Sequence, residues 1–328
     1  MPGCASPPAM KVLITGGAGF LGQRLARTLL AKGSLGGQPI AQLVLVDRVA
    51  AEASDPRVTA IAGDIGDVAV MRDAVAGADA IFHLAAIVSG QAEEDFDLGM
   101  RVNLDALRLL LDLAREGGRR PRFVQTSSVA VYGGALPAMV TDDTPLRPSS
   151  SYGMQKAVGE LLVGDYTRRG YVDGRILRLP TISVRPGKPN RAASSFASGL
   201  IREPLNGEAT VCPVSLDTPL WLLSPRGAID AIVAGAALSG DALGSQRAIN
   251  LPGVSVRVGE MIAALEQVGG TQAVARITHA PDPAIEAIVC SWPAAWDTSR
   301  AARLGFRGDP DFLSIVRAYA EDELGAAK

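Results

Sequence analysis

Cysteine and histidine are scarce in this sequence. Its 328 residues include three cysteines, Cys4, Cys212 and Cys290, and two histidines, His83 and His279. Cysteines so few and so widely spaced argue against a disulfide framework and favour a reducing compartment, which predicts a cytoplasmic protein. The two histidines belong to no cluster with the spacing of metal ligands, so we expect no metal site.

Long apolar runs and a surplus of positive charge are also missing. No apolar run is long enough to span a membrane. Residues 1–10 lack the basic start and apolar stretch of a secretion signal, so we interpret them as a disordered leader. The formal net charge is -2 and no basic stripe is present, so neither nucleic acid nor a membrane is an expected partner. Aromatic residues are only 5% of the chain although hydrophobic residues are 48%; a core of Ala, Val, Leu and Gly is typical of a parallel sheet covered by helices.

Apolar runs that suit buried strands alternate with helical patterns over the first part of the chain. We expect strands at 11–15, 43–47, 58–61, 79–84, 122–126 and 175–179, and helices at 20–32, 93–116 and 151–168. Because parallel strands separated by helices connect through right-handed crossovers, this order predicts an α/β fold with a doubly wound parallel Rossmann sheet.

Beyond this region the alternation is lost, and 180–225 is rich in Pro, Ser, Arg and Gly. Later helices are expected at 229–237, 258–268 and 310–324, with a strand at 248–251. These segments cannot all join one sheet, so a second, smaller unit is needed. We expect a Rossmann domain at 11–180, to which parts of 225–252 return, a smaller C-terminal substrate lobe at 181–225 and 253–310, and a C-terminal helix at 311–328.

The first expected strand ends in a glycine-rich turn, Gly16-x-x-Gly19-x-x-Gly22. Glycine lets the backbone turn tightly and approach a pyrophosphate. The helix that follows, opened by Phe20 and Leu21, presents its amides and dipole to the phosphates. A glycine triplet alone is weak evidence, but its position between a strand and a helix predicts a dinucleotide-binding cradle.

The second expected strand ends at Asp47, whose carboxylate can accept both ribose hydroxyls of an adenosine and would repel a 2′-phosphate, which favours NAD over NADP. Arg48 follows directly and can tolerate a phosphate, so NADP stays open. The stretch 33–42 is longer than usual between the glycines and this acid. Further cofactor contacts are expected from residues that follow other strands: Asp64, Ile65, Leu84, Ala85, Ala86, Pro180, Thr181 and Ile182.

A phenol and an ammonium share one face of the expected helix at 151–168, since Tyr152 and Lys156 are four residues apart. A free tyrosine has a pKa of about 10. The lysine ammonium and the positive nicotinamide ring nearby would lower the pKa of Tyr152, so that it can act as a base, while Lys156 also holds the ribose. Ser128 can hydrogen-bond the substrate oxygen. Asn103 is expected to steady a water or the backbone near the lysine. Tyr132 is a competing phenol without a lysine four residues on, which favours a structural role for it.

Four motifs fall in one order along the chain: TGGAGFLG at 15–22, HLAA at 83–86, TSSVAVYG at 126–133 and YGMQK at 152–156. In these motifs the sequence resembles the extended short-chain dehydrogenase/reductase family from residue 11 to about residue 180. The resemblance implies NAD-dependent alcohol–carbonyl redox chemistry with Ser128, Tyr152 and Lys156 as the catalytic set and Asn103 in support. It also implies a homodimer formed by a four-helix bundle of 93–116 and 151–168 from each subunit.

The run at 178–190 departs from the pattern of family members that act on nucleotide sugars. Together with 192–196 and 224–226 it is similar to family members that oxidise a four-carbon sugar acid at C2 to the 2-oxo acid with NAD. A small polyhydroxy acid needs one cation for its carboxylate and several hydroxyl-binding groups. Segment 180–226 offers candidates for both: Arg185, Arg191, Arg202, Arg226, Thr181, Asn190, Ser194 and Ser195.

Among these cations we favour Arg185 as the carboxylate clamp, because it follows closely after the strand that ends at the nicotinamide. Substrate contacts are also expected from Ser89, Ser128, Tyr152 and Thr181. One alternative is a nucleotide-sugar epimerase or dehydratase with tightly bound NAD, for which this segment offers only Phe196 and Trp221 to stack on a base. A second alternative is a non-catalytic NAD(H)-binding regulator, which the presence of both the tyrosine and the lysine disfavours.

Overall fold

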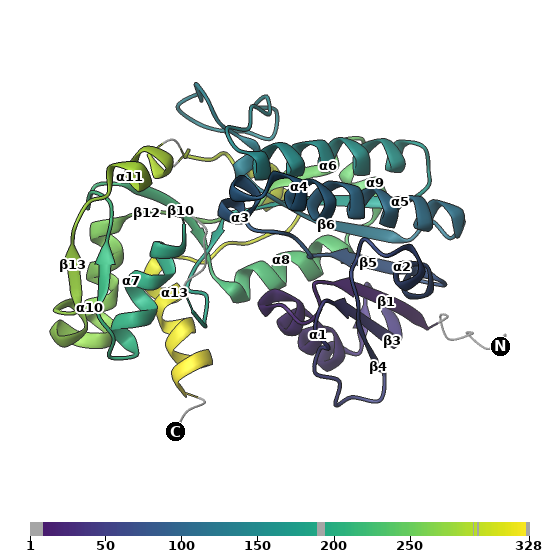
Figure 1. Ribbon diagram of the computed structural model, residues 1–328, viewed down its shortest axis with the longest axis horizontal. Helices are drawn as coiled ribbons and strands as arrows, with labels where there is room; N and C mark the ends of the chain where they lie inside the picture. Colours follow the sequence, from purple (N-terminus) through teal and green to yellow (C-terminus); the bar gives the residue numbers. More distant parts are fainter. Residues whose placement is uncertain (1–8, 189–193, 291, 294, 326–328) are drawn as a thin grey trace.

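A mainly parallel sheet forms the larger half of the protein (Figure 1), as seen in a computed structural model that describes residues 9–188, 194–290, 292–293 and 295–325. Its strand order is β11-β7-β6-β5-β1-β3-β2, and β4 also pairs with β3. Every one of these pairings is parallel except that of β2 with β3. The strands are β1 Met10–Thr15, β2 Ser34–Leu35, β3 Gln38–Asp47, β4 Val58–Ala62, β5 Ala80–His83, β6 Arg122–Ser128, β7 Asp173–Leu179 and β11 Ala248–Asn250. The predicted doubly wound Rossmann sheet is confirmed.

Helices cover both faces of this sheet (Figure 1). Alternate residues of β1 supply two separate cores: Val12 and Ile14 pack on one face, and Leu13 packs on the other. The first face is covered by α1 Phe20–Lys32 and α8 Pro225–Ala237, and the second by α2 Val68–Val75, α5 Ala106–Glu116 and α6 Ser151–Arg168. Burial of each such large aliphatic side chain contributes roughly 1.5–3 kcal/mol.

A smaller lobe follows the seventh strand along the chain and has its own core. It contains a three-stranded sheet, β12-β10-β8, and a two-stranded one, β13-β9. Its strands are β8 Thr181–Ile182, β9 Thr210–Cys212, β10 Pro219–Leu223, β12 Val254–Arg257 and β13 Ile277–His279, and its helices are α7 Ser195–Leu205, α10 Val258–Val274, α11 Pro283–Val289 and α13 Phe312–Tyr319, continued by the π-helix η3 Ala320–Leu324. Helix α13 buries Phe312, Ile315 and Val316 in this core, so the C-terminal helix packs with the lobe.

Several sequence-based boundaries are wrong. The leader was expected to include Met10, but Met10 starts β1 and is buried, while residues 1–8 lie outside the described residues. The single helix expected at 93–116 is interrupted: it becomes α3 Ser89–Glu94, α4 Phe96–Gly99, the π-helix η1 Met100–Asp105 and α5. A π-turn shifts the helical register without changing composition, so the apolar periodicity conceals it.

The long stretch at 33–42 is a hairpin rather than a loop. Gly33 ends α1 in a left-handed conformation, β2 turns back at Gly36 and Gly37, and β3 begins at Gln38. Helix α8 and strand β11 come from the later part of the chain, and they pack on and pair with the Rossmann sheet, respectively.

Cys212 is buried, Cys290 is exposed and both are free thiols, while Cys4 lies outside the described residues. Among the helices that the structure describes, none is both long and apolar enough to cross a membrane.

Candidate active site

A cavity of about 830 Å³ lies at the carboxyl edge of the sheet and is roofed by the smaller lobe. The carboxyl ends of parallel strands are where ligands of such folds bind, because the connecting loops and helix N-termini gather there. Of the residues predicted from the sequence, the following line it: Gly16, Gly19, Phe20, Leu21, Gly22, Asp47, Asp64, Ile65, Leu84, Ala85, Ala86, Ser89, Ser128, Tyr152, Pro180, Thr181, Ile182 and Arg185. Lys156 and Asn103 are buried behind this wall.

The glycine-rich turn leaves no room for side chains. Gly16 has a φ of +74°, and a Cβ added to it would lie 2.8 Å from the backbone nitrogen of Ala85. A Cβ on Gly22 would lie 2.1 Å from the carbonyl oxygen of Gly16. Gly19 caps α1 without a side-chain hydrogen bond, and the first turn of α1 holds no acidic residue. A positive helix end without a competing acid and close backbone packing fit the phosphates of a dinucleotide.

Asp47 connects this turn to the end of β3. Its Oδ2 accepts a hydrogen bond from the backbone N–H of Ala18 at 3.0 Å, and its Oδ1 accepts one from Arg48 at 2.7 Å. Each carboxylate oxygen keeps a further lone pair for a ribose hydroxyl. Asp47 therefore has an ordering role in the turn that the sequence did not reveal, beside the predicted role toward the cofactor.

The catalytic motif sits where α6 meets the end of β6. Ser150 caps α6 by accepting a hydrogen bond from Gly153 at 3.1 Å. A Cβ on Gly153 would lie 2.2 Å from the carbonyl oxygen of Ala130, so glycine at this position lets the helix approach the strand end that carries Ser128. Lys156 donates to the carbonyl oxygen of Thr126 at 2.9 Å, and its Nζ lies 5.6 Å from the ring centroid of Tyr152.

Burial dominates the titration of this pair. It raises the pKa of Tyr152 to about 12, although a hydrogen bond with Ser128 and the positive charge of Arg185 act in the lowering direction. It lowers the pKa of Lys156 to about 8, against the opposing charge of Glu160. The protein without bound cofactor therefore does not show the lowered pKa that the sequence predicts for Tyr152. The nearness of Arg185 to Tyr152 was not foreseen from the sequence.

Asn103 braces the backbone beside the cavity. It projects from the π-helix η1, where its Oδ1 accepts from the N–H of Ile87 at 2.8 Å and its Nδ2 donates to the carbonyl oxygen of Ile87 at 3.1 Å. Nδ2 also donates to Gln155 at 2.7 Å. Of the two roles expected for it, contact with backbone fits this geometry. Asn103 is thus a positioning residue for the loop after β5 and for α6, rather than one that lines the cavity.

A largely buried network of polar side chains lies behind the catalytic motif. It comprises the buried Ser127, Tyr132, Glu160, Arg178 and Asn250 and the partly buried Asp142. Glu160, one turn after Lys156 on α6, accepts from Ser127 at 2.5 Å and forms an ion pair with Arg178 at 2.6 Å. Arg178 also donates to the phenol oxygen of Tyr132 at 2.5 Å, and that phenol donates to Asn250 at 3.0 Å. These contacts fit the structural role expected for Tyr132, which also lines the cavity.

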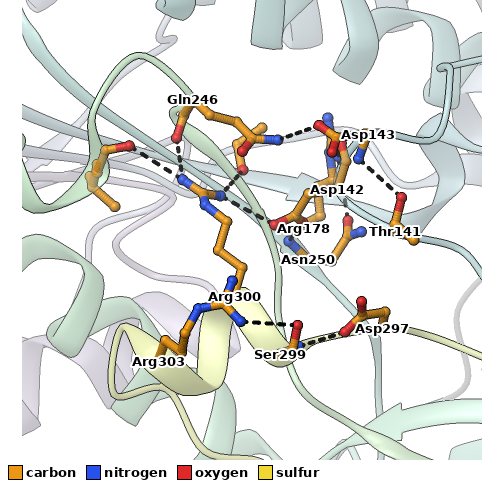
Figure 2. A network of polar contacts seen from close by, with 12 residues as sticks. Thr141, Asp142, Asp143, Arg178, Gln246, Asn250, Asp297, Ser299, Arg300 and Arg303 are labelled. Carbon is orange, nitrogen blue, oxygen red and sulfur yellow. Dashed lines mark hydrogen bonds and ion pairs between the residues drawn. The ribbon is translucent and has the colours of Figure 1, made fainter.

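The outer part of this network ties distant segments together (Figure 2). Asp142 accepts from the backbone N–H of Asn250 at 2.8 Å and pairs with Arg300 at 3.2 Å. Arg300 also donates to the carbonyl oxygens of Ala248 and Gln246. The helix α12 Ser299–Arg303 is thereby fixed to the edge strand β11.

The candidate arginines differ in their surroundings. Arg202 pairs with Glu203 at 2.5 Å and donates to the carbonyl oxygen of Arg185 at 2.8 Å. Arg226 forms ion pairs with Glu321 and Asp322 near the C-terminus. Of the three described candidates, Arg185 is the one that lines the cavity. Ser194 also lines the cavity, whereas Asn190 and Arg191 lie outside the described residues.

Aromatic side chains line the cavity on the side of the smaller lobe, and of these the sequence suggested only Trp221 as a stacking residue. Trp221 and Trp292 line the cavity. Trp221 stacks on Trp296 with ring centroids 6.0 Å apart, and Trp296 meets Tyr132 edge-on at 5.4 Å. The two tryptophans of this stack are 75 positions apart in numbering, at 221 and 296, so only the fold brings them together.

Comparisons with known proteins agree with this geometry. The NAD dependent epimerase/dehydratase family matches residues 12–221. The chain is 60% identical to D-erythronate dehydrogenase of Cupriavidus necator, over 97% of this chain and 100% of that protein. It is 45% identical to D-erythronate dehydrogenase of Haemophilus influenzae, over 96% and 100% respectively. A solved structure described as a nucleoside-diphosphate-sugar epimerase from Agrobacterium tumefaciens superposes with a TM-score of 0.92 at 43% identity, covering 97% of this chain and 95% of that one.

Proposed function

Since the chain belongs to the NAD-dependent epimerase/dehydratase family, we propose that it is an NAD-dependent dehydrogenase that oxidises D-erythronate at C2 to the 2-oxo-tetronate. The observation that carries this proposal is the joint placement of Ser128, Tyr152 and Arg185 on the wall of one cavity. A hydroxyl-orienting group, a base and a cation for a carboxylate are the set that a small 2-hydroxy acid requires. The similarity to two D-erythronate dehydrogenases over nearly the whole chain supports this substrate.

Each residue of the site has a separate role in the proposed reaction. Arg185 pairs with the substrate carboxylate, and Ser128 donates a hydrogen bond to the C2 oxygen. Tyr152, as phenolate, removes the proton of the C2 hydroxyl while the C2–H bond breaks and the carbonyl forms. NAD, when bound against the glycine-rich turn, supplies the hydride acceptor and a positive ring charge. Lys156, held by the carbonyl of Thr126, places a second positive charge near the phenol and is our candidate to hold the nicotinamide ribose.

The remaining cofactor contacts follow from the lining of the cavity. We assign the adenosine ribose to Asp47, the adenine to Asp64 and Ile65, and the face of the dinucleotide to Leu84, Ala85 and Ala86. Pro180, Thr181 and Ile182 follow β7 and border the nicotinamide end, where Thr181 and Ser89 are candidates for substrate hydroxyls. The carboxylate of Asp47 favours NAD over NADP.

We propose further that the protein works as a cytoplasmic homodimer in sugar-acid catabolism. Helices α5 and α6 lie next to each other on the outer face of the sheet (Figure 1). On α6 the side chain of Leu161 is 71% exposed, and pairing of α5 and α6 with those of a second subunit would cover it. Light scattering on the wild type and on Leu161→Asp tests this: a dimer that becomes monomeric is expected, and a monomeric wild type would contradict it.

The first experiment is an absorbance assay at the NADH band near 340 nm. Purified protein is mixed with NAD or NADP and a panel of tetronates and larger sugar acids. NADH formation with D-erythronate is the expected result. The outcome that contradicts the proposal is no reduction with any acid while NAD co-purifies, because tightly held cofactor without net turnover is the behaviour of the alternative epimerase or dehydratase.

A further inference from the structure

A second cavity, of about 360 Å³, opens at the amino edge of the same sheet, opposite the candidate active site. It is lined where strands begin: Met10 starts β1, Arg122 starts β6, Asp173 starts β7, and Arg247 directly precedes β11. None of the residues that line it also lines the active-site cavity. A ligand in this second cavity would therefore occupy a site separate from that of the dinucleotide and the substrate.

The lining is rich in arginine. Arg119, Arg120, Arg122 and Arg247 face only three acids, Asp79, Asp173 and Asp241, across the described residues of the cavity. Two of these acids are already neutralised. Asp79 pairs with Arg119 at 2.6 Å, and Asp173 pairs with both Arg247 at 2.9 Å and the buried Arg175 at 2.7 Å.

Positive charge therefore predominates around Arg120 and Arg122. This excess of positive charge also acts on Arg175, which lies behind the cavity wall. Burial lowers the pKa of Arg175, its bonds to Asp173 oppose that change, and the charges of Arg122 and Arg247 add to the lowering. An anion in the cavity would relieve this repulsion among like charges.

The guanidinium of Arg122 also contains a hydrogen-bond donor that has no acceptor among the described residues. Its Nη1 is buried and has no hydrogen-bond partner among the described residues. A guanidinium stays protonated in proteins, so this group cannot avoid the cost by losing its charge. A buried donor left unpaired is unfavourable, and more so when it is charged. Nη1 itself is covered, so an anion in the cavity would compensate the charge of this guanidinium, which belongs to the cavity lining.

The hairpin of β2 and β3 forms part of this wall. A Cβ on Gly36 would lie 2.7 Å from Nη1 of Arg122, so the turn of the hairpin packs directly on the guanidinium. Gln38, at the start of β3, lines the cavity and adds an amide. This hairpin is the stretch at 33–42 that is longer than usual in the sequence, and the proposed oxidation makes no use of it.

We propose that this amino-edge cavity, built by Arg120, Arg122 and the β2–β3 hairpin, is a binding site for a small phosphate-type dianion. Arginine forks match the oxygens of such an anion with paired, charge-assisted hydrogen bonds. The site is independent of the proposed oxidation. Strand β6 carries Arg122 at one end and Ser128 at the other, so the two sites share one rigid element.

The test titrates inorganic phosphate into the full chain by calorimetry at low ionic strength, with NAD present in excess so that the nucleotide cradle is filled. The wild type is expected to bind one phosphate per chain. Arg122→Gln should weaken binding roughly tenfold or more, since it removes a charge-assisted hydrogen bond. Arg120→Gln, an exposed position, should weaken it by a smaller factor.

Arg257→Gln is the matched control, because Arg257 is 61% exposed on the lobe and its loss changes the net charge equally. It should bind phosphate as the wild type does. Circular dichroism checks that each variant is folded, and if Arg122→Gln is not, the contrast of Arg120→Gln with the control decides. Absence of phosphate binding, or equal binding by all variants, would overturn the proposal.

Discussion

Two tyrosines, Tyr132 and Tyr152, line the same cavity from different polar surroundings. The phenol of Tyr132 belongs to the buried network, where Arg178 donates to it and Asn250 accepts from it. The phenol of Tyr152 belongs to the catalytic motif, with a hydrogen bond from its neighbour Ser128 and the charge of Arg185 close by. The phenol of Tyr132 is hydrogen-bonded to side chains from two distant segments, Arg178 and Asn250, whereas Tyr152 lies beside a lysine and an arginine.

The contrast shows that polar groups that stabilise the fold and polar groups proposed to react lie in different electrostatic environments. In the buried network each charge has a partner, since Glu160 and Arg178 neutralise each other. In the catalytic motif burial opposes the reactive charge state of both groups, raising the pKa of Tyr152 and lowering that of Lys156. Such paired displacements of pKa are typical of acid–base sites that a ligand completes. The predictions that follow set these two regions against each other.

The largest effect is expected for Tyr152→Phe. Removing the proton acceptor should lower kcat for oxidation by about 10²–10⁴-fold, with little change in NAD affinity. Steady-state kinetics with the sugar acid and a direct NAD titration measure the two quantities. Tyr132→Phe is the matched control: it loses buried hydrogen bonds, so the free energy of unfolding should fall by about 1–3 kcal/mol while kcat stays near normal. If the two variants exchanged these behaviours, the roles given to the two phenols would be reversed.

Glu160→Ala is the complementary change in the buried network. It leaves the charge of Arg178 buried without its partner, so the free energy of unfolding should fall by about 3–5 kcal/mol in urea denaturation. The control is Asp165→Ala on the same helix, which breaks the ion pair with Arg168. That pair has side chains 70% and 58% exposed, so its loss should cost less than about 1 kcal/mol. Equal losses in both variants would mean that the buried pair adds no more to stability than the surface pair.

Sequence reasoning was strong for the catalytic motif and weak for the buried network, for a physical reason. Glycine spacing, strand ends and the Tyr152–Lys156 spacing are local patterns, and parallel strands bring their carboxyl ends to one edge whatever else the chain does. The pair of Glu160 with Arg178 joins a helix to a strand, and Tyr132 meets Asn250 across 118 residues. Pairings of this kind depend on the packed fold, as does the place of Arg185 beside Tyr152.

Replacement of Arg185 tests whether this residue binds the carboxylate of the substrate. Arg185→Gln should raise KM for the sugar acid roughly 10- to 100-fold, as expected for the loss of charge-assisted hydrogen bonds to a carboxylate. KM for NAD should change little. Arg226→Gln is the control, because Arg226 is paired with acids near the C-terminus and does not line the cavity. An unchanged KM for the acid in Arg185→Gln would assign the carboxylate to another group.

The smallest effect concerns pH. Oxidation needs the phenolate of Tyr152, and burial raises the pKa of this phenol to about 12, so kcat/KM should rise with pH from neutral into alkaline solution. The positive charge of Arg185 favours the phenolate and lowers that pKa. Arg185→Gln should therefore move the rise of kcat/KM to higher pH, whereas Arg226→Gln should leave it in place. The profiles are compared at fixed ionic strength because salt screens charges near the protein surface. A profile of Arg185→Gln that coincides with the wild type, or lies at lower pH, would show that the charge of Arg185 does not act on the phenol during turnover.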